Sequence, residues 1–143
     1  MKKILAFDYG RKRVGMAISD ELWLLATPLE TQVDKSDEQI FDQVEHLMGT
    51  HQIESFVVGM PYNMNGSIGP GGEKCKEFAE NLSARFSLPC ELWDERLTSV
   101  EAEGIMLMGD LSRKKRKRKV DELAARIILQ SYLAYRKQQS EES

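Results

Sequence analysis

The stretch Ile4–Asp20, ILAFDYGRKRVGMAISD, is the part of the sequence from which the fold can be predicted. Four apolar residues lead to an acid, Asp8, and Tyr9 and Gly10 then turn the chain into a second apolar run, Val14–Ser19. A strand that is apolar on both faces lies inside a sheet covered on both sides. We therefore expect a central strand that brings Asp8 to the rim of the sheet, followed by an antiparallel hairpin.

Asp8 alone has two interpretations. An acid after a strand is commonly just the first residue of a turn. It can also be a functional carboxylate, because binding sites form at the ends of strands. The choice between the two depends on whether other acids reach the same rim.

With 143 residues, 41% of them hydrophobic and 30% charged, the chain has the size and composition of one globular domain. Its apolar runs are far shorter than the ~20 residues of a membrane span, and its first residues lack the pattern of a secretory signal. We expect a cytoplasmic protein in which residues 1–138 form a single domain and residues 139–143 a polar tail. Cys75 and Cys90 are expected to be free thiols.

Charge is distributed unevenly along the chain. There are 23 acidic and 20 basic residues, and seven of the basic residues are consecutive, in Arg113–Lys119. An acidic body with one concentrated basic segment indicates contact with a polyanion. A solvated loop or a localisation-like tract would have the same composition, but this segment directly precedes a predicted helix. Nucleic acid contact of this kind would be salt-dependent and weakly sequence-specific.

The rest of the chain alternates between helix and strand signals. This order fits an α/β fold with a five-stranded mixed sheet, the first three strands antiparallel and the last two parallel, and helices on both faces. The expected elements are an edge strand over residues 24–31 interrupted by Pro28, a helix from the capping box of Ser36 and Gln39 to about Gly49, a strand Ser55–Met60, a helix through Cys75 and Phe86, a strand Cys90–Trp93, a helix from Thr98 to about Gly109, and a helix Val120–Lys137.

The segment Tyr62–Gly72, YNMNGSIGPGG, is a glycine-rich loop between a strand and a helix. Its backbone amides could hold a phosphate, although it matches neither a P-loop nor a dinucleotide-binding fingerprint. A plain connection explains it equally well. Asn63 and Asn65 could contact a substrate.

Acids occur at the rims of three core elements. Asp8 and the pair Asp94 and Glu95 follow strands, and Asp121 opens the last helix at the margin of an apolar stripe. The helix dipole alone would favour an acid at Asp121. Clustered carboxylates are costly unless a cation binds them, and oxygen ligands suit Mg²⁺ or Mn²⁺. Such ions support phosphodiester cleavage. Asp94 and Glu95 should point to opposite faces of the strand, so only one of them is expected to share the ion.

Four linked segments together resemble the YqgF (RuvX) family of bacterial proteins. They are FDYGRKRVGMAISD, VVGMPYNMNGS, WDERLTSVEAE and KVDELAARIILQSYL, and the resemblance runs from Ile4 to about Tyr135. It implies a ribonuclease H-like fold and a divalent-metal nuclease, either of the precursor of small-subunit ribosomal RNA or of Holliday junctions. It also implies that Asp8, Glu95 and Asp121 are the catalytic and metal-ligating triad.

The leading hypothesis is a hydrolase that uses Mg²⁺ or Mn²⁺ to mature the 5′ end of precursor 16S rRNA during ribosome biogenesis. Its partner would be structured RNA, ribosomal particles or branched DNA, and the chain would be a monomer or a homodimer. The residues expected to position phosphates are Arg11, Lys12, Arg13, Arg96, Arg113, Lys114, Lys115, Arg116, Lys117, Arg118 and Lys119.

Three alternatives stay open at this point. A Holliday junction resolvase would need two active sites, and therefore a dimer that makes paired incisions. A non-catalytic binding or ribosome-assembly factor would keep its cellular function after Asp8→Asn. A phosphotransferase of the sugar-kinase and actin superfamily would bind ATP, but those proteins usually enclose the nucleotide between two such domains, and 143 residues supply one.

Overall fold

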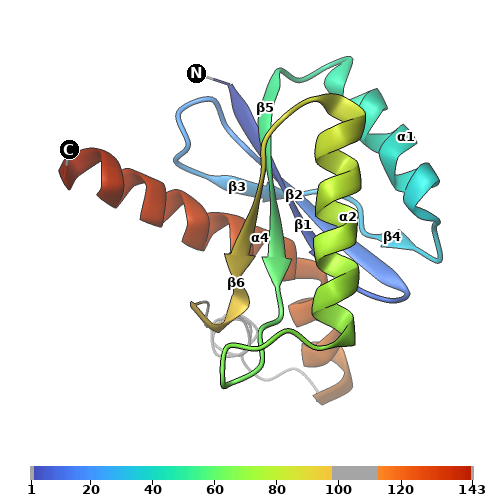
Figure 1. Ribbon diagram of the computed structural model, residues 1–143. Helices are drawn as coiled ribbons and strands as arrows, with labels where there is room; N and C mark the ends of the chain where they lie inside the picture. Colours follow the sequence, from blue (N-terminus) through green and yellow to red (C-terminus); the bar gives the residue numbers. More distant parts are fainter. Residues whose placement is uncertain (1, 98–112, 143) are drawn as a thin grey trace.

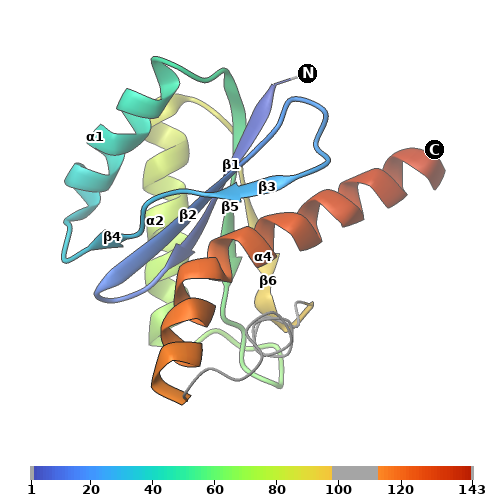
Figure 2. The same ribbon diagram turned by 180° about the vertical axis from the view of Figure 1, so that it is seen from behind.

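The protein folds into three layers, with a mixed sheet between helices on its two faces (Figures 1 and 2). The computed structural model describes residues 2–97 and 113–142, and within the last helix the side chains of residues 123–139. The strands are β1 (Lys3–Tyr9), β2 (Arg13–Ser19), β3 (Ala26–Pro28), β4 (Gln32–Val33), β5 (Ile53–Met60) and β6 (Cys90–Asp94). The helices are α1 (Asp37–Met48), α2 (Pro70–Phe86), the short 3-10 helix η1 (Glu95–Leu97) and α4 (Arg113–Glu142).

The sheet has the order β3-β2-β1-β5-β6, and β4 also pairs with β2. β2 is antiparallel to β1, β3 and β4, whereas β1, β5 and β6 are parallel. The predicted α/β class and mixed sheet are thus confirmed, with β1 in the centre.

The sheet contains six strands rather than the predicted five. The strand expected over residues 24–31 is confined to Ala26–Pro28, and Gln32–Val33 forms an additional strand beyond it. Ala17 of β2 pairs with Pro28 and Val14 pairs with Gln32. The segment from Pro28 to Gln32 therefore has one more residue than the paired segment of β2 from Val14 to Ala17. This extra residue is a β-bulge. Proline has no N–H for the ladder, so the edge is where this interruption is tolerated.

Alternation along β1 divides the core in two. Leu5 and Phe7 lie in the cluster under α1 and α2, and Ile4 and Ala6 lie in the cluster under α4. All four are buried, as the sequence predicts for a doubly covered strand. The same alternation places Asp8 on the α4 face of the sheet.

The helix predictions hold for α1 and are shifted for α2. Ser36 caps α1, and both hydrogen bonds of the predicted capping box with Gln39 are present. α2 begins at Pro70, so the glycine-rich loop ends at Gly69 and not at Gly72. Proline is well suited to the first turn of a helix.

α4 is longer than the predicted helix Val120–Lys137 at both ends, because it runs from Arg113 to Glu142. Lysine and arginine are good helix formers, so the basic segment continues the helix backbone. The predicted helix between Thr98 and Gly109 lies outside the described residues, and the division into a domain and a tail stays a prediction.

Two further expectations concern the thiols and the membrane. Cys75 is buried, Cys90 is partly buried, and both are free. Within residues 2–97 and 113–142, none of the helices has the length and apolar character needed to span a membrane.

Candidate active site

The turn between β1 and β2 places three cations beside Asp8. The Gly10 N–H donates to the Arg13 carbonyl at 2.9 Å, which leaves Arg11 and Lys12 as a two-residue turn. A Cβ atom at Gly10 would lie 2.7 Å from the Arg13 carbonyl oxygen, so a glycine is required here. This tight turn brings the exposed cations to the rim where Asp8 ends its strand.

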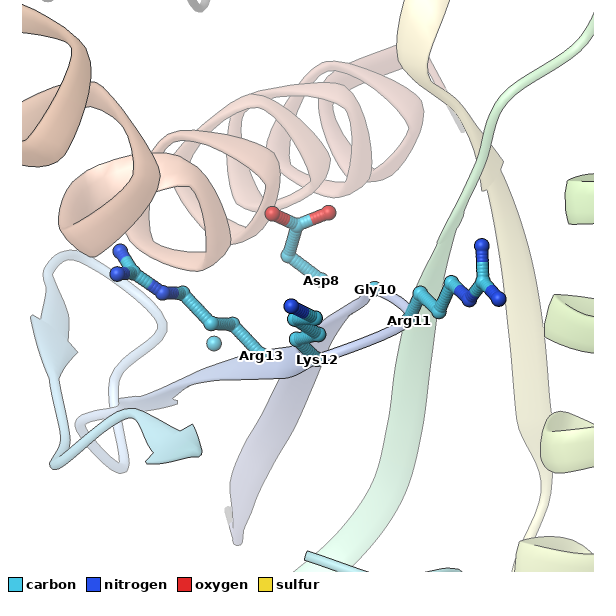
Figure 3. Close-up of a pocket in the computed structure, with 6 residues that line it drawn as sticks. Asp8, Gly10, Arg11, Lys12 and Arg13 are labelled. Carbon is cyan, nitrogen blue, oxygen red and sulfur yellow. The ribbon is translucent and has the colours of Figure 1, made fainter. Parts of the chain in front are cut away.

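An open hollow of about 460 Å³ surrounds the Asp8 side chain (Figure 3). Asp8 pairs with Gly15 of β2. Because glycine has no side chain, the Asp8 carboxylate is left uncovered on that side. Figure 3 shows the Asp8 carboxylate standing clear of the sheet, with the three cations of the turn spread around the hollow. The hollow is lined by Asp8, Gly10, Arg11, Lys12, Arg13 and Gly15.

Tyr9 fixes the end of β1 from the opposite face of the sheet. Its hydroxyl donates to Asp37 Oδ1 at 2.6 Å, and its ring stacks on Phe78 with centroids 4.3 Å apart. Burial, together with the bond to Asp37, raises the pKa of Tyr9 above its usual value, so the phenol keeps its proton. Asp8 therefore projects from a strand end that is anchored on its other side.

Glu95 reaches the same rim from the end of β6. Gly59 of the neighbouring strand β5 gives it room, since a Cβ atom there would lie 2.9 Å from Glu95 Oε1 and 2.7 Å from Ile128 Cδ1 of α4. A glycine inside a strand often marks such a close approach. Gly59 is thus a site residue that the sequence analysis included only as part of the predicted strand Ser55–Met60.

Asp8 and Glu95 form a carboxyl pair that shares a hydrogen bond. Burial, followed by the charge of Asp8, the hydrogen bond with Asp8 and the charge of Asp94, raises the pKa of Glu95 from 4.5 to about 7. At neutral pH the pair therefore holds a proton for part of the time, because two carboxylates this close repel each other.

The donor chemistry of this pair fits a hard divalent cation. Such an ion binds carboxylate oxygens and would replace the shared proton. Asp8 and Glu95 are two of the three predicted ligands. Among the residues whose side chains are described, no group of three or more potential ligands gathers at one point.

Asp94 has a different partner from Glu95, as strand alternation predicts. Its Oδ1 accepts from the Arg96 N–H at 2.9 Å and from Arg96 Nε at 3.0 Å, and its Oδ2 is 2.8 Å from Arg96 Nη2. These bonds to Arg96 hold the pKa of Asp94 below its usual value. Arg96 Nη1 also donates to the carbonyls of Asn63 and Met64, at 3.2 and 3.4 Å. Asp94 thus fastens the glycine-rich loop, and Glu95 meets Asp8.

The third predicted acid, Asp121, does not open the last helix, because α4 begins eight residues earlier, at Arg113. The side chains of Asp121 and of the basic segment Arg113–Lys119 are outside the described part of the chain. Their roles stay predictions. The rest of the predicted stripe is confirmed, because its four apolar members are buried against the sheet. They are Ala124, Ala125, Ile128 and Tyr132.

Comparison with known proteins places this geometry in a family context. The sequence profile of the family described as "RuvX: Holliday junction resolvase" matches residues 2–135. A relative from Halothermothrix orenii is 44% identical over 133 residues, covering 93% of this chain and 95% of the relative. A relative from Bacillus cytotoxicus is 47% identical over 133 residues, covering 92% and 97%. Both are named "Putative pre-16S rRNA nuclease".

Among solved structures, T. thermophilus RuvC in complex with a Holliday junction substrate is similar, with a TM-score of 0.55. The match covers 95% of this chain and 96% of that protein at 14% identity. At this identity the likeness concerns the fold alone, and it confirms the predicted ribonuclease H-like architecture.

The raised pKa of Glu95 predicts a pH-dependent stability. The folded state holds this proton more tightly than the unfolded state, so the pair destabilises the metal-free protein increasingly as pH rises from about 4.5 to about 7. Replacing Glu95 with glutamine should raise the free energy of unfolding by about 2 kcal/mol at pH 8 in EDTA, and by little at pH 4. Urea unfolding at both pH values measures this. Glu21→Gln, at an exposed acid, is the control, and an equal gain at both pH values would contradict the prediction.

Gly59→Ala should displace the Glu95 carboxylate without unfolding the protein, because the added methyl group meets the ends of two side chains rather than backbone. We expect the pKa of Glu95, followed by ¹³C NMR of its carboxyl carbon, to fall by about one unit. Gly71→Ala is the matched control, since a Cβ atom there meets nothing within 4 Å. An unchanged pKa in Gly59→Ala would show that Gly59 does not set the position of Glu95.

The separate roles of Asp94 and Glu95 can be distinguished by hydrogen exchange. Asp94→Asn weakens the hold of Arg96 on the loop, so the amides of Asn63 and Gly66 should exchange about tenfold faster. Glu95→Gln should leave them unchanged. If both substitutions accelerated exchange equally, Asp94 would not be the residue that fastens the loop.

Proposed function

This chain belongs to the RuvX family, and on that premise we propose that it is a divalent-metal-dependent nuclease that matures the 5′ end of precursor 16S rRNA. The observation that carries the proposal is the Asp8–Glu95 carboxyl pair, which lies at the sheet rim beside the cationic turn. An acid pair with a purely structural role would not require an open hollow lined by three cationic side chains. A site that holds a metal cation against a nucleic acid backbone needs acids to bind the metal and cationic side chains to bind the phosphates.

Each residue would have a distinct task in this reaction. Asp8 and Glu95, with Asp121 from α4, would hold Mg²⁺ or Mn²⁺. When bound, the ion would supply positive charge to the phosphate and lower the pKa of a water molecule. Arg11, Lys12 and Arg13 would bind the phosphates on either side of the cut. The two-residue turn of Arg11 and Lys12, with Arg13 at the start of β2, limits how far the backbone of these residues can move.

The remaining predicted cations would contribute in two ways. The segment Arg113–Lys119 would extend the electrostatic contact along the substrate, which makes binding sensitive to salt. Arg96 is engaged by Asp94 and by the loop carbonyls, so its part would be to position the loop. The nuclease would act in the cytoplasm, with residues 1–138 as its catalytic domain.

The substrate is proposed to be RNA because the relatives that are 44% and 47% identical carry the name of a pre-16S rRNA nuclease. The second candidate is a four-way DNA junction, which the family description favours. The two differ in the assembly that they need. Resolution of a junction requires two sites that cut opposed strands, whereas trimming of RNA requires one.

The test is cleavage of a labelled precursor 16S rRNA fragment and of a labelled four-way DNA junction, in Mg²⁺, in Mn²⁺ and in EDTA. We expect metal-dependent cutting of the RNA that falls at least about a hundredfold in Asp8→Asn, Glu95→Gln and Asp121→Asn. Glu21→Gln, which removes an exposed acid from the β2–β3 connection, should cut like the wild type.

Three results would change the assignment. Paired incisions in the DNA junction, with the RNA left intact, would favour the second candidate. Cutting that survives in EDTA would overturn the metal dependence. Salt-sensitive binding of both substrates, with no cutting by any variant, would make the protein a binding factor.

A further inference from the structure

The loop after β5 is a small ordered hairpin, here called the tip hairpin, whose ends Tyr62 and Ile68 pair as an antiparallel bridge. The Asn63 N–H donates to the Ser67 carbonyl at 2.9 Å, and the Gly66 N–H donates to the Asn63 carbonyl at 2.8 Å. Gly66 has a φ of 86°, in the left-handed region. A three-residue loop that ends in a left-handed glycine is a well-defined hairpin turn. The glycine-rich segment is therefore a built turn and not a slack connection.

Side chains stiffen the tip hairpin further. The Asn63 amide donates to Ser67 Oγ at 2.9 Å, and Asn65 Oδ1 accepts from Ser67 Oγ at 2.6 Å and from the Ser67 N–H at 3.0 Å. The two asparagines are thus used inside the hairpin. The sequence suggested that Asn63 and Asn65 could contact a substrate. In the structure their side chains instead shape the turn that carries Met64, the residue between them.

Arg96 attaches the tip hairpin to the candidate active site. Its Nη1 atom donates to two hairpin carbonyls, its guanidinium lies 5.4 Å from the centroid of the Tyr62 ring, and Asp94 holds it in place. Asp94 and Arg96 flank Glu95 in the sequence. The hairpin consequently lies beside η1 at the end of the sheet to which β1, β5 and β6 all point (Figure 1).

Met64 stands at the corner of this turn with 93% of its surface exposed, the highest value among the large hydrophobic residues of the described chain. Water does not stabilise an exposed apolar side chain. The turn that carries Met64 is joined through Arg96 to the segment that holds Glu95 at the candidate active site. The cations of the hollow suit phosphates. A methionine suits the flat face of a base, because its thioether is polarisable and packs on aromatic rings.

We propose that Met64 packs against a base next to the cleaved phosphodiester and takes the place of that base's stacking neighbour. Apolar side chains on rigid elements open base steps in this way in other nucleic-acid-binding proteins. The substrate would then be a strand whose base at the cut is unpaired or easily opened, at a single-strand–duplex boundary or a branch, in preference to a continuous duplex. The inference rests on the proposed function for the identity of the strand that Met64 meets.

The test uses base fluorescence in a complex that cannot cut. An RNA stem with a 5′ single-stranded extension carries 2-aminopurine at the first paired position, where stacking quenches it. Asp8→Asn protein in EDTA should raise the fluorescence severalfold on binding. Adding Met64→Ser should abolish most of this rise and weaken binding to the extended stem about fivefold, while affinity for a blunt duplex of the same sequence stays unchanged.

Two further variants control for folding and for general loss of apolar surface. Met64→Leu should restore the fluorescence rise, because leucine keeps the apolar volume. Leu22→Ser is the matched control, since Leu22 is 63% exposed in the connection after β2, which lies at the other end of the sheet from Asp8. It should behave like the Asp8→Asn parent.

The outcomes separate this inference from the proposed function. A Met64-dependent fluorescence rise, together with a wild-type protein that cuts neither substrate in Mg²⁺ or Mn²⁺, would retain the base contact and overturn the nuclease. Normal cutting with a rise that Met64→Ser leaves intact would overturn the base contact alone, and would leave a protein partner as the occupant of the tip. Absence of binding to both RNAs would overturn the base contact together with its premise.

Discussion

Two carboxyl groups share a hydrogen bond at one end of the sheet, and the surrounding structure has to hold them there against their repulsion. Asp8 comes from the end of a central strand and Glu95 from the residue after an outer one, so the sheet sets the backbone positions from which the two side chains meet. Gly59 leaves the space between them and α4 that the Glu95 carboxylate needs. Burial, and after it the repulsion by Asp8, raises the pKa of Glu95, and a divalent cation bound between the two carboxylates would relieve both effects.

The two faces of the sheet contribute differently to this arrangement. On the face of α1 and α2, aromatic packing and the bond from Tyr9 to Asp37 anchor the end of β1. On the face of α4, the same strand end carries Asp8 beside an open hollow. Alternation directs the side chains of these two adjacent residues to opposite faces of the sheet. Tyr9 therefore anchors the strand on one face, and Asp8 reaches the candidate site on the other. The sequence Asp8-Tyr9-Gly10 combines an acid, an anchor and a turn in three residues.

The segment Asp94-Glu95-Arg96 combines chemistry and support in a similar way. Glu95 joins the acid pair, whereas Asp94 and Arg96 neutralise each other and fasten the tip hairpin. An ion pair that is partly exposed contributes little to overall stability. Its value here is positional, because it sets where Met64 stands relative to the acids. The cationic turn and the tip hairpin would then contact different parts of a nucleic acid, the phosphates and a base.

The sequence by itself determined the class of the fold and the end of the sheet at which the candidate site lies. Three local signals predicted elements of the fold. They are the doubly apolar run before Asp8, the capping box at Ser36 and the interruption at Pro28. In each case the local conformational preference agrees with the tertiary structure. The four family segments predicted Asp8, Glu95 and Asp121 as the acids of the site, as an implication of the resemblance. The basic segment predicts an anionic partner, because seven consecutive cations favour contact with a polyanion.

Only the tertiary structure decided which residues meet. Asp8 and Glu95 are far apart in the chain, and the pairing of β1 with β5 and of β5 with β6 brings them together. The role of Gly59 depends on a distance across two strands and a helix, and a lone glycine in a strand carries no such information. The sequence left Asp94 and Glu95 undecided because they are neighbours of the same type. Alternation predicts that the two side chains point in opposite directions, but which of them meets Asp8 is decided only when the strand has a place in the sheet. In the structure Asp94 bonds to Arg96, and Glu95 meets Asp8.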